Sequence, residues 1–265
     1  MHAMLKAILA EKEKEIDELK SRANPFPERP GSLLRRDFKE AISRPGRVNL
    51  IAEIKFASPS AGRIREGMEP EEVGKIYEQA GAAAISLLTD KMFFAGDIRF
   101  LSRIKKVLQI PVLRKDFIVD PIQVRESAAF GADALLLIAR ILTPSRLKEL
   151  IDLSRELEMS ALVEVHNLED LDKAIGAGAE IIGINNRDLD TFAVTLETSR
   201  TLLPRIPQGC VKVAESGIKG PEDINLLAEK GLQAVLVGTS LMKAPAIKAK
   251  AEELVQAGIK TGDKA

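Results

Sequence analysis

Short apolar runs alternate with longer amphipathic stretches along most of this chain. Continuous apolar runs are typical of strands that are buried on both faces, as in a parallel sheet covered by helices. Each run is followed by a stretch long enough for a helix or a helical turn, which indicates repeated β–α units. The predicted strands are Val48–Ile54, Ala83–Leu88, Pro111–Leu113, Ala134–Ile138, Ser160–Val163, Ile181–Ile184, Val211–Ala214 and Ala234–Val237.

A glycine signal recurs with a period of roughly 50 residues, about the length of two β–α units. Gly81, Gly131, Gly178 and Gly231 each close a predicted helix and lead into an apolar strand. A doubly wound open sheet would give a similar alternation, but eight units with glycine at every second one favour a closed barrel. The sequence therefore predicts an α/β fold, a (β/α)8 TIM barrel, as one domain over residues 1–265.

Residues 1–46 are predicted to form an N-terminal helical extension of this barrel. The first 22 residues read as an amphipathic helix, and a second helix is expected over Ser32–Arg44. A stripe of aliphatic side chains on the first helix predicts that it docks on the barrel surface: Leu5, Ile8, Leu9, Ile16 and Leu19. We expect the first helix to serve packing, and the second to reach over one rim of the barrel and support substrate affinity.

Composition narrows the class of partner. The 39 basic and 39 acidic residues give a formal net charge of zero, so nucleic acid and membrane surfaces are not expected as partners. The single cysteine, Cys210, cannot form an internal disulfide, and the N-terminal residues lack the apolar core of a signal peptide. The sequence thus indicates a cytoplasmic protein that acts on a small molecule, as a monomer or a weak homodimer.

Candidate chemistry lies where each strand ends, because barrel enzymes place their reactive groups at the carboxyl ends of the strands. One such residue alone is more often a solvated strand end, but convergence of many on a single rim indicates a site. The polar residues at these ends are Glu53, Lys55, Lys115, Asp116, Glu164, Asn185, Arg187 and Glu215. We predict that they face a common pocket.

Phosphate is the predicted charged part of the ligand. Ser216–Gly217 and Gly238–Thr239 follow the seventh and eighth strands, where barrels commonly bind phosphate through backbone N–H groups of glycine-containing turns. Residues 239–242 are a candidate for the short extra helix that often completes such a site. Elsewhere in a chain, the same Ser-Gly and Gly-Thr pairs would be interpreted as ordinary turn residues.

No organic cofactor or zinc ion is expected. The sequence has two histidines, His2 and His166, without the clustering that a zinc site needs, and it has no dinucleotide fingerprint or Walker loop. His166 is interpreted as a loop or helix-start residue rather than a catalytic base. A magnesium ion held by Glu53, Glu164 or Glu215 stays open as an alternative.

Several stretches together make the chain resemble the indole-3-glycerol phosphate synthase family over nearly its whole length. They are residues 51–55 with 58–60, 86–90 with 93–96, 113–117, 162–166, 182–189, 214–218 and 237–242. One departure is visible, because Phe56 and Ala57 stand between Lys55 and Ser58, where the family often has a further basic residue. The resemblance therefore implies no secondary charge contact at this position.

The resemblance implies cofactor-free conversion of 1-(2-carboxyphenylamino)-1-deoxyribulose 5-phosphate into indole-3-glycerol phosphate, carbon dioxide and water. Ring closure needs an acid that protonates the substrate carbonyl oxygen, and Lys115 is the candidate. By family analogy, Glu164 and Lys55 share the proton donor and base roles of dehydration. Glu53 is expected to orient the lysines.

Asn185 and Glu215 complete the candidate catalytic residues, and the other site residues are assigned to binding. The resemblance implies that Asn185 and Glu215 bond the sugar hydroxyls and that Arg187 adds positive potential. The anthranilate ring is expected in an apolar slot, and the phosphate near Lys55 or Ser58 and on the backbone of the two glycine turns. The candidates for the slot are Pro59, Phe94 and Phe117, and those for the phosphate are Ser216, Gly217, Gly238 and Thr239.

Three other functions remain open. A phosphoribosylanthranilate isomerase would be expected to use a cysteine and an aspartate, but Cys210 lies at the wrong end of its strand. A Schiff-base aldolase would use Lys115 or Lys55 and form a covalent adduct that borohydride traps. A catalytically silent binding barrel would have no need for the four convergent charges of Glu53, Lys55, Lys115 and Glu164.

Overall fold

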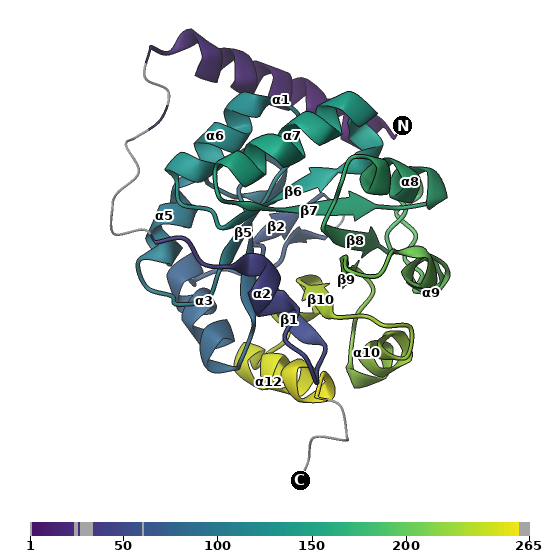
Figure 1. The fold of residues 1–265 in the computed structure, drawn as a ribbon. Coiled ribbons are helices and arrows are strands. Elements are labelled where there is room, and N and C mark those ends of the chain that lie inside the picture. The colour runs from purple at the N-terminus through teal and green to yellow at the C-terminus, as the bar shows by residue number, and fades with distance from the viewer. Residues whose placement is uncertain (1, 24–25, 27–33, 60, 260–265) are drawn as a thin grey trace.

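Parallel strands closed into a barrel form the centre of the molecule (Figure 1). The computed structural model describes residues 2–23, 26, 34–59 and 61–259. Each strand pairs in parallel with the strand before it, and the last pairs with the first. The eight barrel strands are β1 Asn49–Ile54, β4 Ala84–Leu88, β5 Val112–Lys115, β6 Ala134–Ile138, β7 Ser160–Val165, β8 Ile181–Asn185, β9 Val211–Glu215 and β10 Ala234–Val237. The predicted TIM barrel is confirmed.

Four strands run further than their apolar runs predicted. β5, β7, β8 and β9 continue to or past Lys115, Glu164, Asn185 and Glu215, which the sequence analysis placed just after the strands. A charged residue ordinarily marks the point where a buried strand meets water. Here the strands extend because these side chains lie in a shared polar cavity, so the site is built on the sheet itself.

Helices cover the outside of the barrel: α3 Pro70–Gln79, α5 Arg99–Lys105, α6 Pro121–Ala129, α7 Pro144–Glu156, α8 Leu168–Gly176, α9 Glu197–Leu202, α10 Pro221–Ala228 and α12 Ile247–Ala257. Short elements lie in the loops: the β2–β3 hairpin of Ala57–Ser58 and Gly62–Arg63, α4 Lys91–Phe94, η1 Ala139–Ile141, η2 Leu203–Arg205 and α11 Thr239–Met242. Several helices begin with proline after a capping side chain, as in α6, where Asp120 accepts the Ile122 N–H.

The second helix of the extension is shorter than predicted and lies at the other end of the barrel. Helix α2 spans Phe38–Ile42 rather than Ser32–Arg44; residues 34–37 are not helical, and residues 32–33 lie outside the described ranges. Phe38 and Ile42 are buried among side chains of the barrel interior, including Ile51. The side chain of Asn49, the first residue of β1, donates to Ile42 O at 3.0 Å. Helix α2 therefore plugs the amino-terminal end of the barrel.

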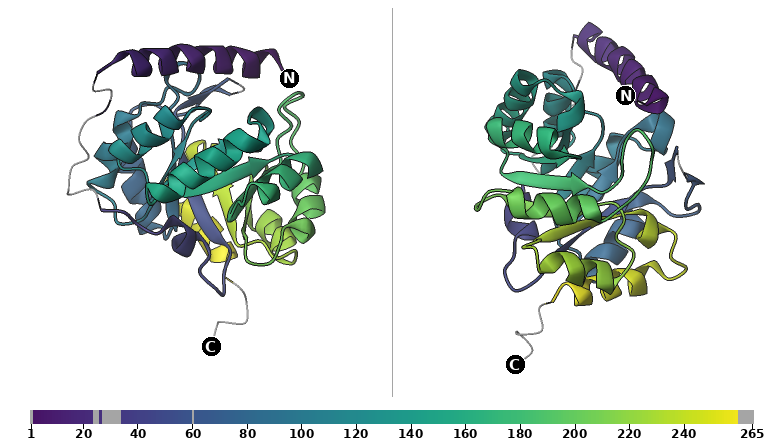
Figure 2. Two further views of the ribbon diagram at one scale, coloured as in Figure 1. Left: turned by 45° about the horizontal axis from the view of Figure 1, so that its top comes forward. Right: turned by 90° about the vertical axis from the view of Figure 1, so that its right-hand side faces the viewer.

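The first helix lies across the opposite end. Helix α1, Ala3–Ser21, runs over the top of the molecule in the left view of Figure 2. Its predicted apolar stripe faces the protein, with Leu5, Ile8 and Ile16 buried. The roles expected for the two helices are thus exchanged: α1 covers the carboxyl ends of the strands, and α2 supports the core away from them.

Because α2 acts as a plug, we expect Phe38→Ala to lower the free energy of unfolding by about 3 kcal/mol or more, the usual cost of the cavity left by a buried phenylalanine. The Michaelis constant of the folded variant should stay unchanged. Denaturant unfolding and steady-state kinetics measure the two effects. Leu34→Ala is the control, since that side chain is 73% exposed in the same segment. A raised Michaelis constant with unaltered stability would contradict this assignment.

Candidate active site

A cavity of about 580 Å³ opens at the carboxyl ends of the barrel strands. Every residue that the sequence analysis assigned to catalysis or binding lines it, although these residues come from most of the strands and their following loops. They are Glu53, Lys55, Ser58, Pro59, Phe94, Lys115, Phe117, Glu164, Asn185, Arg187, Glu215, Ser216, Gly217, Gly238 and Thr239. The predicted convergence on one rim is present in the structure.

Two lysines and three buried glutamates form the polar centre of the cavity. Lys115 Nζ at the end of β5 lies 3.5 Å from Glu164 Oε2 on β7 and 3.5 Å from Glu215 Oε2 on β9. Lys55 Nζ, just after β1, lies 2.6 Å from Glu53 Oε1. The Lys115 ammonium therefore occupies the space between two of the carboxylates that were considered as magnesium ligands.

Burial and mutual charge set the protonation of this centre. Burial alone would lower the pKa of Lys115, but the carboxylates of Glu164, Glu215 and Glu53 raise it above its ordinary value. Burial would raise the pKa of Glu164, but Lys115, His166 and a hydrogen bond with Asn185 together outweigh burial and lower it. For Glu215, burial raises the pKa, with Glu164 and Glu53 adding to the rise against the opposing effect of Lys115. These shifts keep Lys115 charged and Glu164 ionised at neutral pH, whereas the raised pKa of Glu215 favours its protonated form.

Glu215 has unused hydrogen-bonding capacity. Its two carboxyl oxygens are buried and form no hydrogen bond with any part of the chain that the structure describes. Glu215 Oε2 forms an ion pair with Lys115 Nζ at 3.5 Å. A buried polar group without a hydrogen bond is costly, so such a group commonly belongs to a site that a ligand completes. This carboxyl lines the cavity and is free to bond a hydroxyl group of a substrate.

Two glycines make room for the glutamates: Gly183 lies in β8 beside β9, and Gly238 directly follows β10 beside β1. A Cβ atom at Gly183 of β8 would lie 2.3 Å from Glu215 Oε1, and one at Gly238 would lie 2.1 Å from Glu53 Oε1. Both distances are far below van der Waals contact. Gly238 was predicted only as a phosphate turn; the structure shows that it also accommodates Glu53, which no pattern in the sequence indicates.

We expect Gly183→Ala to displace the Glu215 carboxyl group and lower kcat by about tenfold or more, since a 1 Å error in a catalytic group can cost that much. The barrel should still fold, which circular dichroism checks. Gly176→Ala is the matched control, because a Cβ atom there meets nothing within 4 Å. Equal kcat values for the two variants would show that the position of Glu215 is unimportant.

His166 is buried beside Glu164, and the sequence analysis did not predict this contact. It lies between β7 and α8, as the interpretation of a loop or helix-start residue requires. Its Nε2 is 3.2 Å from Glu164 Oε1, and its Nδ1 is 3.5 Å from Asp170 Oδ2. Burial would lower the pKa of His166, but Asp170 and Glu164 raise it to about 9. The imidazole is therefore cationic at neutral pH.

This raised pKa predicts a pH dependence of stability. A histidine stabilised in its charged form contributes fully below its unfolded pKa of about 6.5, and the contribution is lost as the pH rises through about 9. We expect His166→Gln to be less stable than the parent protein at pH 6, with the difference shrinking towards pH 10. Denaturant unfolding across this range measures it. Parallel pH profiles for the two proteins would contradict the charge assignment.

The apolar side of the cavity combines barrel loops with the first helix. Phe94 of α4 and Phe117 after β5 face each other with ring centroids 6.2 Å apart. Met4, Leu5 and Ile8 of α1 line the same cavity. The sequence showed the stripe on α1, but an amphipathic pattern does not tell which surface the helix covers. The apolar wall of the cavity is therefore formed by both predicted and unpredicted residues.

The loop after β8 closes another side. Asn185 Oδ1 accepts the Arg187 N–H at 3.0 Å, and the Arg187 guanidinium donates to Phe192 O at 3.2 Å. The Phe192 ring packs edge-to-face on His2 of the segment before α1, with centroids 4.7 Å apart. Cavity-lining residues that the sequence analysis did not name include Leu189, Phe192, Val194, Lys219 and Lys243.

Neither a metal centre nor a membrane-spanning helix is found in the described residues. No group of three histidine, cysteine, aspartate or glutamate residues there is arranged to hold a metal ion. No helix in those ranges is long and apolar enough to cross a membrane. The fold and the cavity define a (β/α)8-barrel enzyme whose lysine and glutamate side chains converge beside an apolar slot.

Comparisons with known proteins identify the family. The family model for indole-3-glycerol phosphate synthase matches residues 5–254. The chain is 49% identical over 242 residues to the indole-3-glycerol phosphate synthase of Geobacillus kaustophilus, covering 91% of this chain and 92% of the relative. It is 46% identical over 245 residues to that of Pelodictyon phaeoclathratiforme, covering 91% and 96%. The chain belongs to the indole-3-glycerol phosphate synthase family.

This membership confirms the expected family and the expected kind of enzyme, a lyase of tryptophan biosynthesis. A solved structure of 3-hexulose-6-phosphate synthase resembles the chain with a TM-score of 0.65 at 14% identity, covering 79% of this chain and 99% of that one. At this low identity, the likeness supports the barrel fold alone.

Proposed function

We propose that this enzyme closes the indole ring of 1-(2-carboxyphenylamino)-1-deoxyribulose 5-phosphate without a cofactor, releasing carbon dioxide and water. The observation that carries the proposal is the position of Lys115. Its ammonium is held charged chiefly by Glu164 and lies 3.5 Å from the Glu215 carboxyl group, in the same cavity that Phe94 and Phe117 line. An acid beside an aromatic slot is what attack of a ring carbon on a carbonyl group requires.

In the first step, the aromatic carbon attacks the carbonyl carbon, and Lys115 protonates the oxygen as negative charge develops on it. Loss of carbon dioxide then restores electrons to the ring. In the last step, the new hydroxyl group leaves as water, which needs one proton donor and one base. Lys55 and Glu164 take these two roles, and Glu53, at 2.6 Å from Lys55, orients that lysine.

Substrate binding is divided between three parts of the cavity. Asn185 and the protonated Glu215 bond the sugar hydroxyls, and Arg187 adds positive potential. Pro59, Phe94 and Phe117 enclose the anthranilate ring, which gains most from burial against apolar and aromatic side chains. The phosphate lies on the backbone after β9 and β10, near Lys55 or Ser58, at residues Ser216, Gly217, Gly238 and Thr239.

Gly238 is a poor place to test the phosphate assignment. A side chain there would push against Glu53 as well as block the turn, so a raised Michaelis constant would come with a disturbed catalytic pair. We further propose that residues 1–265 work as one domain, with residues 1–46 as its extension. A cytoplasmic monomer or weak homodimer acting on this small substrate, with no nucleic acid or membrane partner, fits the even charge balance.

Lys115→Ala tests the reaction directly. We expect kcat to fall by about two orders of magnitude or more, as for other lost general acids, with a much smaller change in the Michaelis constant. Indole fluorescence after mixing with the substrate follows the product under single-turnover conditions. Lys106→Ala, at an exposed position, is the control.

Two outcomes would overturn the assignment. Near-normal turnover of Lys115→Ala in a chemistry-limited step would remove the acid role. A covalent adduct trapped by borohydride in the parent enzyme would favour the aldolase alternative, because the ring-closing reaction forms no bond between enzyme and substrate.

A further inference from the structure

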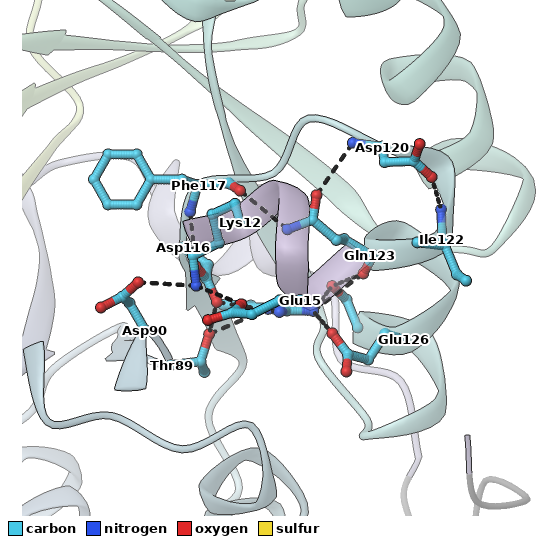
Figure 3. Close-up of polar contacts among 12 residues, drawn as sticks. Lys12, Glu15, Thr89, Asp90, Asp116, Phe117, Asp120, Ile122, Gln123 and Glu126 are labelled. Atoms are coloured by element: carbon cyan, nitrogen blue, oxygen red, sulfur yellow. Dashed lines mark hydrogen bonds and ion pairs between the residues drawn. The ribbon is translucent and has the colours of Figure 1, made fainter. Parts of the chain in front are cut away.

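A buried lysine on the first helix is the least expected charge in the molecule. Lys12 of α1 is 1% exposed, and its Nζ lies 2.8 Å from Asp90 Oδ2, 3.0 Å from Asp116 Oδ1 and 2.8 Å from Glu15 Oε2 (Figure 3). Asp90 follows β4 and Asp116 follows β5, and both are buried. Burial would lower the pKa of Lys12, but Asp116 and Asp90 raise it, so the side chain stays charged.

Each aspartate holds a segment that carries one ring of the apolar slot. Asp90 caps α4, where its Oδ1 accepts the Phe93 N–H at 2.7 Å, one residue before Phe94. Asp116 Oδ1 accepts the backbone N–H of Phe117 at 2.8 Å. Lys12 therefore joins the two carboxylates that fix the backbone next to Phe94 and Phe117.

Asp116 is also held by residues other than Lys12. Asp116 Oδ2 accepts from Thr89 Oγ1 at 2.5 Å and from Arg114 Nη2 at 3.1 Å. Arg114 in turn pairs with Glu126 of α6 at 2.9 Å. These contacts fix the carboxyl end of β5. Because Lys12 binds Asp116 there, it also fixes the position of α1, whose Leu5 and Ile8 line the cavity.

We propose that Lys12 is a positioning residue for the aromatic part of the substrate: by bridging Asp90 and Asp116, it sets the spacing between Phe94, Phe117 and helix α1 around the ring. The inference rests on the proposed function, because the slot is taken to receive the anthranilate ring. It does not require Lys12 to touch the substrate. Lys55 and Lys115 line the cavity and can contact the substrate, whereas Lys12 does not line it.

The test compares variants that lose the bridge with one that loses a surface pair. Lys12→Met removes the charge but leaves two buried carboxylates, which endangers folding. Lys12→Met combined with Asp90→Asn leaves fewer unpaired charges: asparagine still caps α4, and Asp116 keeps Arg114. Lys14→Met is the matched control, because Lys14 pairs with Glu11 on the exposed side of the same helix.

Three measurements are made on each folded variant: kcat, the Michaelis constant for the substrate, and the inhibition constant of ribulose 5-phosphate, which lacks the ring. We expect the double variant to raise the Michaelis constant about tenfold, as for a displaced binding wall, with kcat within about threefold. The inhibition constant should stay unchanged, and Lys14→Met should resemble the parent enzyme. An unaltered Michaelis constant, or equal weakening of both ligands, would overturn the proposal.

Phe117→Ala separates failure of this inference from failure of the proposed function. If the slot binds the ring, this variant weakens binding of the substrate but not of ribulose 5-phosphate, whatever Lys12 does. If Phe117→Ala leaves both ligands unaffected, the ring binds elsewhere and the proposed function of the slot is wrong. If Phe117→Ala is selective and the double variant is not, only the role of Lys12 is refuted.

Discussion

Burial of charge at the carboxyl end of the barrel is the constraint on which the rest of the site depends. An ionised side chain removed from water is expensive unless opposite charges surround it. Glu53, Glu164 and Glu215 are each almost fully buried, and two lysines cannot neutralise three carboxylates. The excess is relieved by a proton on Glu215, whose pKa is raised, and by His166 beside Glu164. The protonation states that the chemistry needs thus follow from the cost of burial.

The same constraint explains which features were predictable. Apolar runs determine the barrel, since a strand covered on both faces must be apolar, and the strand ends then place the polar residues on one rim. The predicted strand bounds were too short because a charged residue such as Glu164 looks like the edge of the sheet when its partners are unknown. The ion-pair partner of Glu164, Lys115, lies on another strand, and a local sequence pattern does not show which strands meet.

The sequence analysis missed the roles of Lys12, His166 and Gly183. Each role depends on contacts with side chains of other elements. Lys12 is four residues from both Ile8 and Ile16, so helical spacing places it on the buried face of α1, but a lysine is ordinarily expected to reach water. It is buried because two aspartates from other elements meet it. The sequence analysis expected the second helix rather than the first to support the substrate, because neither pattern says which end of a barrel its helix covers. Only the packing of Phe38 inside the barrel distinguishes them.

The end of β5 shows how one strand serves two charged networks without mixing them. Successive side chains of a strand point to opposite faces. Leu113 packs in the barrel interior and Lys115 lines the cavity, whereas Arg114 pairs with Glu126 on the helix side. Asp116, directly after the strand, borders the cavity as predicted, but its carboxylate pairs with Arg114 and Lys12. Lys115 therefore keeps Glu164 and Glu215 as its own partners, although a carboxylate follows it directly in the sequence. The network of Asp116, Arg114 and Lys12 holds α1 in place. The separate network of Lys115, Glu164 and Glu215 sets the pKa of the catalytic lysine.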